Sequence, residues 1–428
     1  MNISTKLLKA AAGQAGGVSL DVDEVFSTFL WEGNSSTRNI QNGIDLTEGG
    51  LVWGKARTQS YKHTLFDTAR GVNKAISSNS TDAEVTETGV TAFNSNGFTL
   101  GTWAGLNDNG EDFVSWTFRK APKFFDVVTY TGDGSNYRNI SHNLGSVPGH
   151  VMVKKTSGGS VAGWINWHRT FSDYQSVFLN TTEATYSGGS NGGVFGQASG
   201  FTSTQFQLGG PNNITYHNEN GSTYVAYLFA HNDSGDGGFG PDSDQDIIKC
   251  GSYSTNSSAD ASINLGFEPQ WVMFRPYDDT SDWKIIDNMR GFVATPASGN
   301  YNKQLAANSS GAEADNDNIK ITSTGFEHVS GFASKNFIYM AIRRGPLAVP
   351  EDATKVFKAA TYTSAGNTNL VNLGFNPDFN INTTTSSSSD NYAVTRLLGK
   401  KYVKTNSNAS QGDSSETNVV NDQTQVVA

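Results

Sequence analysis

The stretch NFIYMAIRRGP, residues 336–346, occurs in this chain in two earlier versions. Residues 112–122 read DFVSWTFRKAP, and residues 223–233 read TYVAYLFAHND. All three are rich in aromatic and β-branched residues, which is typical of a β-strand, and all three end in a basic or polar turn. Each version follows a Gly-Phe pair, which begins at Gly97, Gly200 or Gly325. The chain is therefore predicted to repeat one domain, with this stretch as the last core strand of each copy.

A second landmark, Asn-Leu-Gly, begins at Asn143, Asn264 and Asn372. Copies of both landmarks lie about a hundred residues apart, which is the size of a domain. The landmark at Asn372 predicts a fourth copy without a closing strand, either shortened or completed by another chain. The predicted organisation is an N-terminal arm (1–23), repeat one (24–122), repeat two (123–233), a Gly/Asp-rich linker (234–245), repeat three (246–346), and a link with the incomplete fourth repeat and a polar tail (347–428).

Composition and turn spacing predict an all-β fold. The chain has 46 glycines and 11% aromatic residues, but only 16% charged residues. Within each repeat, turn signals recur about every ten residues and helical periodicity is nearly absent. We therefore expect tandem β-sandwich domains, jelly-roll or lectin-like, preceded by a short arm. The strand order is not readable from the pattern.

The overall charge and the apolar runs exclude several classes of protein. The net charge is -10 and no basic face is visible, which argues against a nucleic-acid partner. A single cysteine, Cys250, excludes an intramolecular disulfide framework. The N-terminal residues lack the apolar core of a secretion signal, and no run approaches 18 apolar residues, so we expect no membrane insertion.

The N-terminal arm contains one short amphipathic pattern. Leu7, Leu8 and Ala11 would lie on one face of a helix that ends at a cluster of glycines. A helix of this length is marginal unless it is docked, so we interpret the arm as an attachment peptide. The alternative is a frayed terminus.

The segment GWINWHRTF in repeat two is the best candidate for a ligand surface. Aromatic faces stack on sugar rings, and neighbouring polar groups bind hydroxyls. The alternative is that these residues form core and corner packing, since related residues recur in the other repeats. The candidate glycan-stacking residues are Trp164, Trp167, His168, Arg169, Trp283 and Arg290.

No motif predicts a metal site, a cofactor or catalysis. Asp242, Asp244 and Asp246 resemble the start of an EF-hand, but Ile247 stands where a Gly is needed and Tyr253 where a Glu is needed. We interpret this segment as a solvated linker. The histidines are scattered, no HExxH or GxSxG motif occurs, and His168 with Asp173 has no recognisable nucleophile. We therefore expect a protein that is not an enzyme.

Several stretches resemble repeat-built virion proteins of marine bacteriophages, mostly phages of cyanobacteria. These proteins are tail or tail-fibre-associated. The stretches are VFSTFLWEGNSSTRNIQNGIDLTEGGLVWGKART (25–58), LFDTARGVNK (65–74), FNSNGFTLG (93–101) and WTFRKAPKFFDVVTYTG (116–132), followed by HNLGSVPG (142–149). The resemblance extends through Pro346 and is strongest from Val25 to Trp167. It implies no catalytic residues.

The resemblance implies a virion protein made in the host cytoplasm and located in the tail, as a fibre or a tail-attached appendage. Its expected partners are other tail proteins (adaptor, nozzle or baseplate) and a host surface glycan or lipopolysaccharide. Fibres are commonly trimers, and a homotrimer would give the fourth repeat partners for its open strands. The alternatives are a carbohydrate-binding module array and a capsid-decorating protein.

Overall fold

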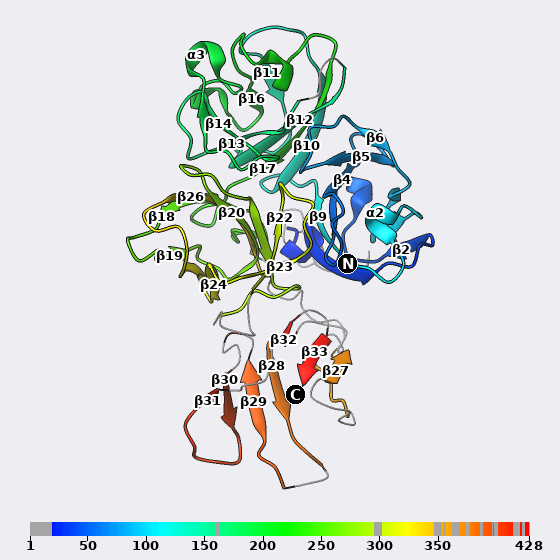
Figure 1. Cartoon of the computed structure of the whole chain (residues 1–428), viewed down its shortest axis with the longest axis vertical. Helices are drawn as coiled ribbons and strands as arrows, with labels where there is room; N and C mark the ends of the chain where they lie inside the picture. The colour runs from blue at the N-terminus through cyan, green and yellow to red at the C-terminus, as the bar shows by residue number, and fades with distance from the viewer. Residues whose placement is uncertain are drawn as a thin grey trace.

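The computed structural model describes residues 19–345, apart from 159–161, 241 and 295–301, and parts of the segment 353–427. The described chain is built almost entirely of antiparallel β-sheets, which confirms the predicted all-β class and its tandem β-sandwich units (Figure 1). Three units share one topology, and the described residues of a fourth unit form part of it beside them. No helix in this part of the chain is long and apolar enough to span a membrane.

Each of the three complete units has a six-stranded sheet with its strands in the same order. In unit one the order is β1 (Phe26–Glu32), β9 (Asp112–Arg119), β3 (Gly50–Ala56), β4 (Thr64–Asp67), β5 (Lys74–Ser77) and β6 (Val85–Thr86). In unit two it is β10 (Phe125–Thr131), β17 (Thr223–Phe229), β12 (His150–Ser157), β13 (Ile165–His168), β14 (Gln175–Phe178) and β15 (Tyr186–Ser187). In unit three it is β18 (Ile248–Ser254), β26 (Asn336–Arg343), β20 (Pro269–Pro276), β21 (Lys284–Asp287), β22 (Asn302–Ala306) and β23 (Ala314–Asn316).

The closing strand of each unit is inserted between the first and third strands of its sheet. In unit one, Phe118 of β9 lies opposite Phe26 of β1 on one side and Leu51 of β3 on the other. The six central residues of β9 are all buried, and the same holds for β26. The prediction that this stretch is a core strand is therefore confirmed.

A smaller sheet covers one face of each six-stranded sheet and completes the sandwich. In units one and three, the Gly-Phe pair begins a strand of this sheet, and Phe98 and Phe326 are fully buried. A Cβ atom at Gly97 would lie 2.0 Å from the Ile40 carbonyl oxygen, so only glycine fits there. The smaller sheets are β2 (Arg38–Ile40), β8 (Gly97–Leu100) and β7 (Val90–Asn94); β11 (Asn139–Ser141) and β16 (Gln205–Gln207); and β19 (Ala261–Asn264), β25 (Gly325–His328) and β24 (Ile319–Thr322).

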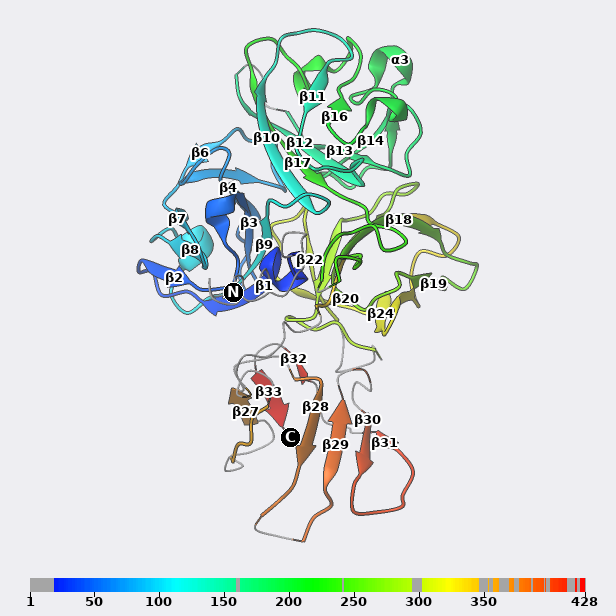
Figure 2. The ribbon, with the colours of Figure 1, turned by 180° about the vertical axis from the view of Figure 1, so that it is seen from behind.

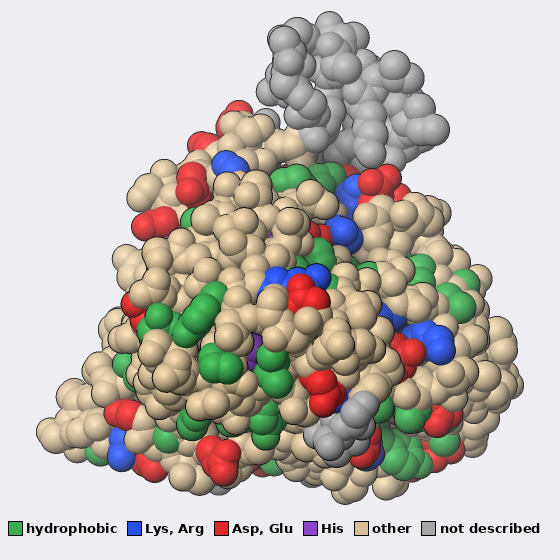
Figure 3. All heavy atoms as spheres, turned by 90° about the horizontal axis from the view of Figure 1, so that it is seen from above, with side chains coloured by type: hydrophobic (Ala, Val, Ile, Leu, Met, Phe, Trp, Pro, Cys, Tyr) green, Lys and Arg blue, Asp and Glu red, His purple; other side chains and the backbone are tan. Residues whose placement is uncertain are grey.

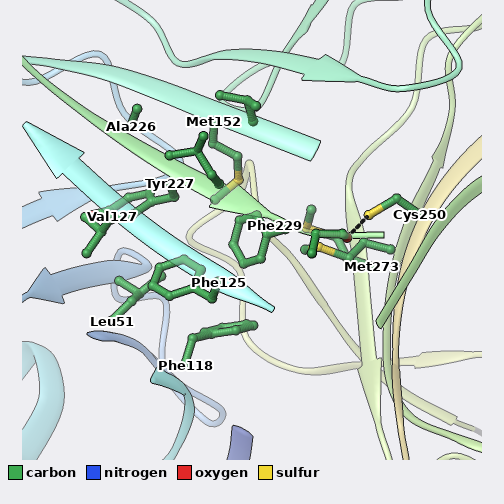
Figure 4. Packing of buried hydrophobic residues seen from close by; sticks show 14 of the residues in the cluster. Leu51, Phe118, Phe125, Val127, Met152, Ala226, Tyr227, Phe229, Cys250 and Met273 are labelled. Atoms are coloured by element: carbon green, nitrogen blue, oxygen red, sulfur yellow. Dashed lines mark hydrogen bonds between the residues drawn. The ribbon is translucent and has the colours of Figure 1, made fainter. Parts of the chain in front are cut away.

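The opposite faces of the three large sheets meet in a shared interior. Figures 1 and 2 show the three units around a common centre, and one cluster of buried apolar residues draws members from all of them. The Phe118 ring of unit one lies 5.3 Å from the Phe229 ring of unit two and 6.0 Å from the Trp271 ring of unit three, between ring centroids. Figure 4 shows Leu51, Phe118, Phe229 and Met273 in this interior. The units form a closed ring and not a string of separate domains.

The segment interpreted from its composition as a flexible linker, residues 234–245, is folded against the chain. Phe239 is only 3% exposed and packs with the shared core. The Gly240 amide donates to the Leu20 carbonyl at 3.0 Å, and the Asp246 carboxylate accepts from the amides of Gly235 and Gly237. In the described part of the chain, the short helices are η1 (Val22–Glu24), η2 (Leu46–Glu48), α2 (Ala104–Asn107), α3 (Gly189–Gly192), η3 (Ala198–Gly200) and η4 (Ile214–Tyr216).

The fourth unit lies outside the ring, below it in Figure 1. One sheet has the order β28 (Phe379–Asn382), β29 (Tyr392–Thr395), β30 (Lys401–Lys404) and β31 (Gly412–Asp413), like the third to sixth strands of a complete unit. The other has the order β27 (Asn369–Asn372), β33 (Thr424–Val427) and β32 (Val420–Asn421), like the smaller sheets. Among the described residues, β28 is an edge strand with no closing strand beside it.

Candidate functional site

Buried charged side chains gather where the three units of the ring meet. Lys55, Lys154 and Arg275 occupy equivalent positions on the third strands, and all three are fully buried. The Lys154 Nζ donates to the Thr81 carbonyl of unit one at 2.8 Å, and the Arg275 guanidinium donates to the Glu183 carbonyl of unit two at 2.6 Å. Burial lowers the pKa of Lys55 and of Lys154 to about 8, because the charged form loses its hydration.

The same backbone hydrogen bond closes each of the three contacts between units. The Glu84 amide of unit one donates to the Thr156 carbonyl of unit two at 2.9 Å. The Thr185 amide of unit two donates to the Tyr277 carbonyl of unit three at 2.8 Å. The Glu313 amide of unit three donates to the Arg57 carbonyl of unit one at 2.7 Å. The last contact also carries an ion pair, with 3.0 Å between Arg57 Nε and Glu313 Oε2. A contact that repeats and returns to its start defines a ring.

An acidic side chain at the end of the fourth strand joins neighbouring units in two places. Asp287 accepts from Arg290 Nε at 2.6 Å and from Trp116 Nε1 of unit one at 3.0 Å. Asp67 of unit one is arranged in the same way, with Arg70 Nε at 2.6 Å and the Tyr227 hydroxyl of unit two at 2.7 Å. Both carboxylates are fully buried, and each compensates the charge of the buried arginine beside it.

Unit two has an uncharged version of this contact. His168 stands at the position of Asp67 and Asp287, and Phe171 at the position of the arginines. The His168 Nε2 lies 3.2 Å from the Tyr339 carbonyl of unit three. Burial lowers the pKa of His168 to about 3, so the imidazole is neutral at physiological pH.

The ring coincides with the part of the chain that matches a known family. Residues 21–346 match the family described as Domain of unknown function (DUF7483). The chain belongs to this family. No curated protein matches the chain. The matched residues span all three complete units and stop before the fourth, so the DUF7483 domain is the whole ring and not one sandwich.

The DUF7483 ring buries five of the six side chains that the sequence offered as glycan-stacking candidates. Trp164, Trp167, His168, Trp283 and Arg290 are at most 3% exposed, and only Arg169 is exposed. Trp164 Nε1 donates to the Ser77 carbonyl of unit one at 2.8 Å, and Trp283 Nε1 donates to the Phe178 carbonyl of unit two at 2.9 Å. These two tryptophans hold units together, and neither presents a face to a sugar.

The remaining candidates are placed just as clearly. Trp167 stacks on Phe201 inside unit two, with 3.7 Å between ring centroids. Arg290 is bound to Asp287 and covers the Trp116 ring at 5.3 Å. The five buried side chains therefore expose no ring face or polar edge for stacking on a sugar. Contacts between units cover Trp164, His168, Trp283 and Arg290, and packing inside unit two covers Trp167. The predicted attachment residues Leu7, Leu8 and Ala11 lie outside the described residues.

Sequence reasoning missed the buried cations that lie where the units meet. Lys55, Lys154 and Arg275 stand at one register of the third strand, within GLVWGKA, HVMVKKT and PQWVMFRP. A cation at the same register of three strands that are rich in apolar residues was the available signal. It indicates a buried position that must be satisfied by polar partners. In the ring, Lys154 and Arg275 reach carbonyls of a neighbouring unit. Lys55 donates to the Ala56 and Gln59 carbonyls of its own unit.

The described part of the chain contains no group of three or more His, Cys, Asp or Glu residues placed to hold a metal ion. The Asp246 carboxylate binds backbone amides of its own segment. Cys250 is buried, and burial raises the pKa of its thiol. On the face seen in Figure 3, acidic and basic side chains are scattered among uncharged atoms, without a broad patch of one sign.

Proposed function

We propose that this chain is a structural component of a bacteriophage virion, a tail fibre or a tail-attached appendage that contributes to host-surface attachment. It acts by holding and contacting other molecules and not by catalysis. The observation that carries this proposal is the use of the buried charged and aromatic side chains. In the ring these groups bind other units of the same chain, which is the chemistry of a rigid building block.

The ring suits a protein that must keep its shape outside the cell without disulfides. The chain has one cysteine, and it is buried and free. Stability comes from a core shared by three units, so no unit can open without exposing the others. Buried hydrogen bonds between the units and the Arg57–Glu313 ion pair fix how the units are oriented, as a fibre or appendage requires.

The virion location is supported by the sequence resemblance, which runs through the three units of the ring. The chain enters the ring beside the place where unit three ends. A Cβ atom at Gly345 would lie 2.5 Å from Asp23 Oδ1, and the Ser19 hydroxyl donates to the Gly240 carbonyl. In this proposal the N-terminal arm docks onto an adaptor, nozzle or baseplate protein of the tail, and the chain is a homotrimer.

The experiment that tests the proposal is immunogold labelling of intact phage particles that encode this chain, with antibody fragments raised against the purified protein. Label at the tail is expected. Label confined to the head would replace the tail assignment with capsid decoration. Absence of the chain from purified particles, measured by mass spectrometry, would refute a virion role altogether. Particles lacking the chain but otherwise complete should adsorb less well to host cells, which tests the attachment role.

A further inference from the structure

The fourth unit exposes a set of apolar side chains whose equivalents are buried in the ring. The landmark NLGFNP at residues 372–377 matches NLGFEP at residues 264–269, which aligns Phe379 with Trp271 and Ile381 with Met273. Strand pairing gives the same alignment. Ile381 lies opposite Ala393 of β29, as Met273 lies opposite Ile285 of β21.

The equivalent positions in the ring are closed to solvent because neighbouring units cover them. Trp271 and Met273 of unit three are 0% exposed, and so are Leu51 and Trp53 of unit one. In the fourth unit, Phe379 is 57% exposed and Ile381 is 54% exposed. Phe379 and Ile381 thus have the same register and lie on the same face of the sheet as Trp271 and Met273, but no neighbouring unit covers them.

A third side chain extends the same surface across the sheet. Val403 of β30 lies opposite Ala393, as Leu305 of β22 lies opposite Ile285. Val403 is 41% exposed, whereas Leu305 is 1% exposed. Residues that lie directly opposite one another point to the same side of a sheet. Phe379, Ile381, Ala393 and Val403 therefore form one apolar surface, which we call the fourth-unit face.

In β28 the apolar side chains are on the exposed side and the polar side chains on the sandwich side, which is the reverse of what a solitary domain needs. The strand reads Phe-Asn-Ile-Asn, and its asparagines point to the side that faces the smaller sheet in a complete unit. In unit three the matching residues are Val272 and Phe274, which pack in the sandwich core. In β28, the apolar residues of the face that packs against other units are kept and those of the sandwich side are replaced by asparagine. In β29, Val394 remains apolar and buried at the position of Ile286 in the sandwich core.

We infer that three copies of this chain associate through their fourth-unit faces. The chain itself supplies the argument for this partner. Three equivalent faces of the ring already pack against one another, so a face of this register and composition is covered by others of its kind. Thr383 stands where the ring has Lys55, Lys154 and Arg275. The contact between copies therefore buries apolar side chains without a buried cation.

This association names the surface that would join the copies in the homotrimer of the proposed function, but it does not depend on a virion location and holds for any structural role of the chain. The test is the mass of the purified full chain in solution, measured by sedimentation velocity and light scattering at micromolar concentration. We expect three times the single-chain mass of 45.9 kDa. The double variant F379D/I381D should sediment as a single chain, with its dissociation constant raised at least about a hundredfold. V403D should weaken the trimer as well.

Val147→Asp is the matched control, because Val147 is 50% exposed but lies on the ring. It should leave the trimer intact. Circular dichroism of all variants should show an unchanged ring, which separates dissociation from unfolding. A wild-type monomer, or a dimer, overturns the proposal. A trimer that survives both F379D/I381D and V403D overturns the assignment of the face, even if labelling places the chain in the virion.

Discussion

Replacing Asp287 by asparagine tests whether the charges at the centre of the ring act as buried ion pairs. Asp287 and Arg290 both have side chains that are 0% exposed, with 2.6 Å between Arg290 Nε and the carboxylate. Asp287 also accepts from the Arg290 amide at 2.9 Å and from Trp116 Nε1 at 3.0 Å. Asparagine has the same size, so no cavity forms. It has one acceptor oxygen and no charge.

Removing one partner of a buried ion pair costs about 3–5 kcal/mol, because the other charge stays buried without compensation. Glu313 remains near Arg290, with 3.4 Å between Oε2 and Nη1, which places D287N at the lower end of this range. We therefore expect D287N to lower the free energy of unfolding by about 3 kcal/mol. This is a large fraction of the stability of a typical domain, about 5–15 kcal/mol.

The measurement is urea unfolding followed by tryptophan fluorescence and by circular dichroism, with the matched control D82N. Asp82 forms a 2.6 Å ion pair with Lys62, but both side chains are more than half exposed. Exposed pairs contribute at most about 1 kcal/mol. If D287N costs no more than D82N, the carboxylate does not hold unit one to unit three, and buried ion pairs do not stabilise the ring interior.

Burial and backbone geometry support three further predictions. Burial lowers the pKa of His168 to about 3 and of His217 to about 4, so the unfolded chain binds protons at these histidines before the folded chain does as pH falls below about 6.5. The free energy of unfolding should therefore be lower at pH 5 than at pH 8, by about 2 kcal/mol for each histidine. H168Q should reduce this difference. Gly97→Ala should cost more than about 2 kcal/mol, because Gly97 has a φ of 115° and a Cβ there meets a carbonyl; Gly71→Ala, with a φ of 93° and open space, should cost about 1 kcal/mol in the same unfolding assay. Trp164→Ala should lower the free energy of unfolding by about 3–5 kcal/mol, and weaker glycan binding by a variant of unchanged stability would contradict its core role.

The sequence predicted what depends on local patterns. The aromatic and β-branched content of the repeated stretch, the spacing of the turn signals and the recurrence of Gly-Phe pairs indicated the all-β class and the closing core strand. These signals are local because a strand shows its two faces in alternate residues. The landmark at Asn372 likewise predicted a fourth copy. The structure describes its two sheets in the same strand order as the corresponding parts of complete units.

The ring was not predicted, because its contacts join residues far apart in the sequence. Trp116 and Asp287, or Tyr227 and Asp67, meet only when the units are assembled. One signal was present nevertheless. The closing strands are apolar at nearly every position, as in FIYMAI, and a strand of a solitary sandwich needs apolar residues on one face only. A strand buried on both faces implies a second layer, which a neighbouring unit provides.

Contacts between distant parts of the sequence also explain why Trp164 and Trp283 could be interpreted as ligand-binding residues. Trp164 and Trp283 recur at one position beside polar residues, a pattern shared by sugar-binding faces and by polar contacts between domains. The two alternatives differ only in what covers the indole rings, and coverage is a property of the assembled chain. Each indole N–H donates to a carbonyl of the preceding unit, so the polar edge that suggested a ligand serves the interface.

In the proposed trimer, the fourth unit would be covered by residues of other copies of the chain. In β20 of unit three both faces are apolar, since Val272 and Phe274 fill the sandwich while Trp271 and Met273 fill the ring. In β28 only the ring-type residues, Phe379 and Ile381, remain apolar. A unit adapted to stand alone would lose these first, because exposed aromatic and branched side chains gain nothing in water. Their retention on the exposed side, with asparagine on the other, is what a strand needs when other copies cover it.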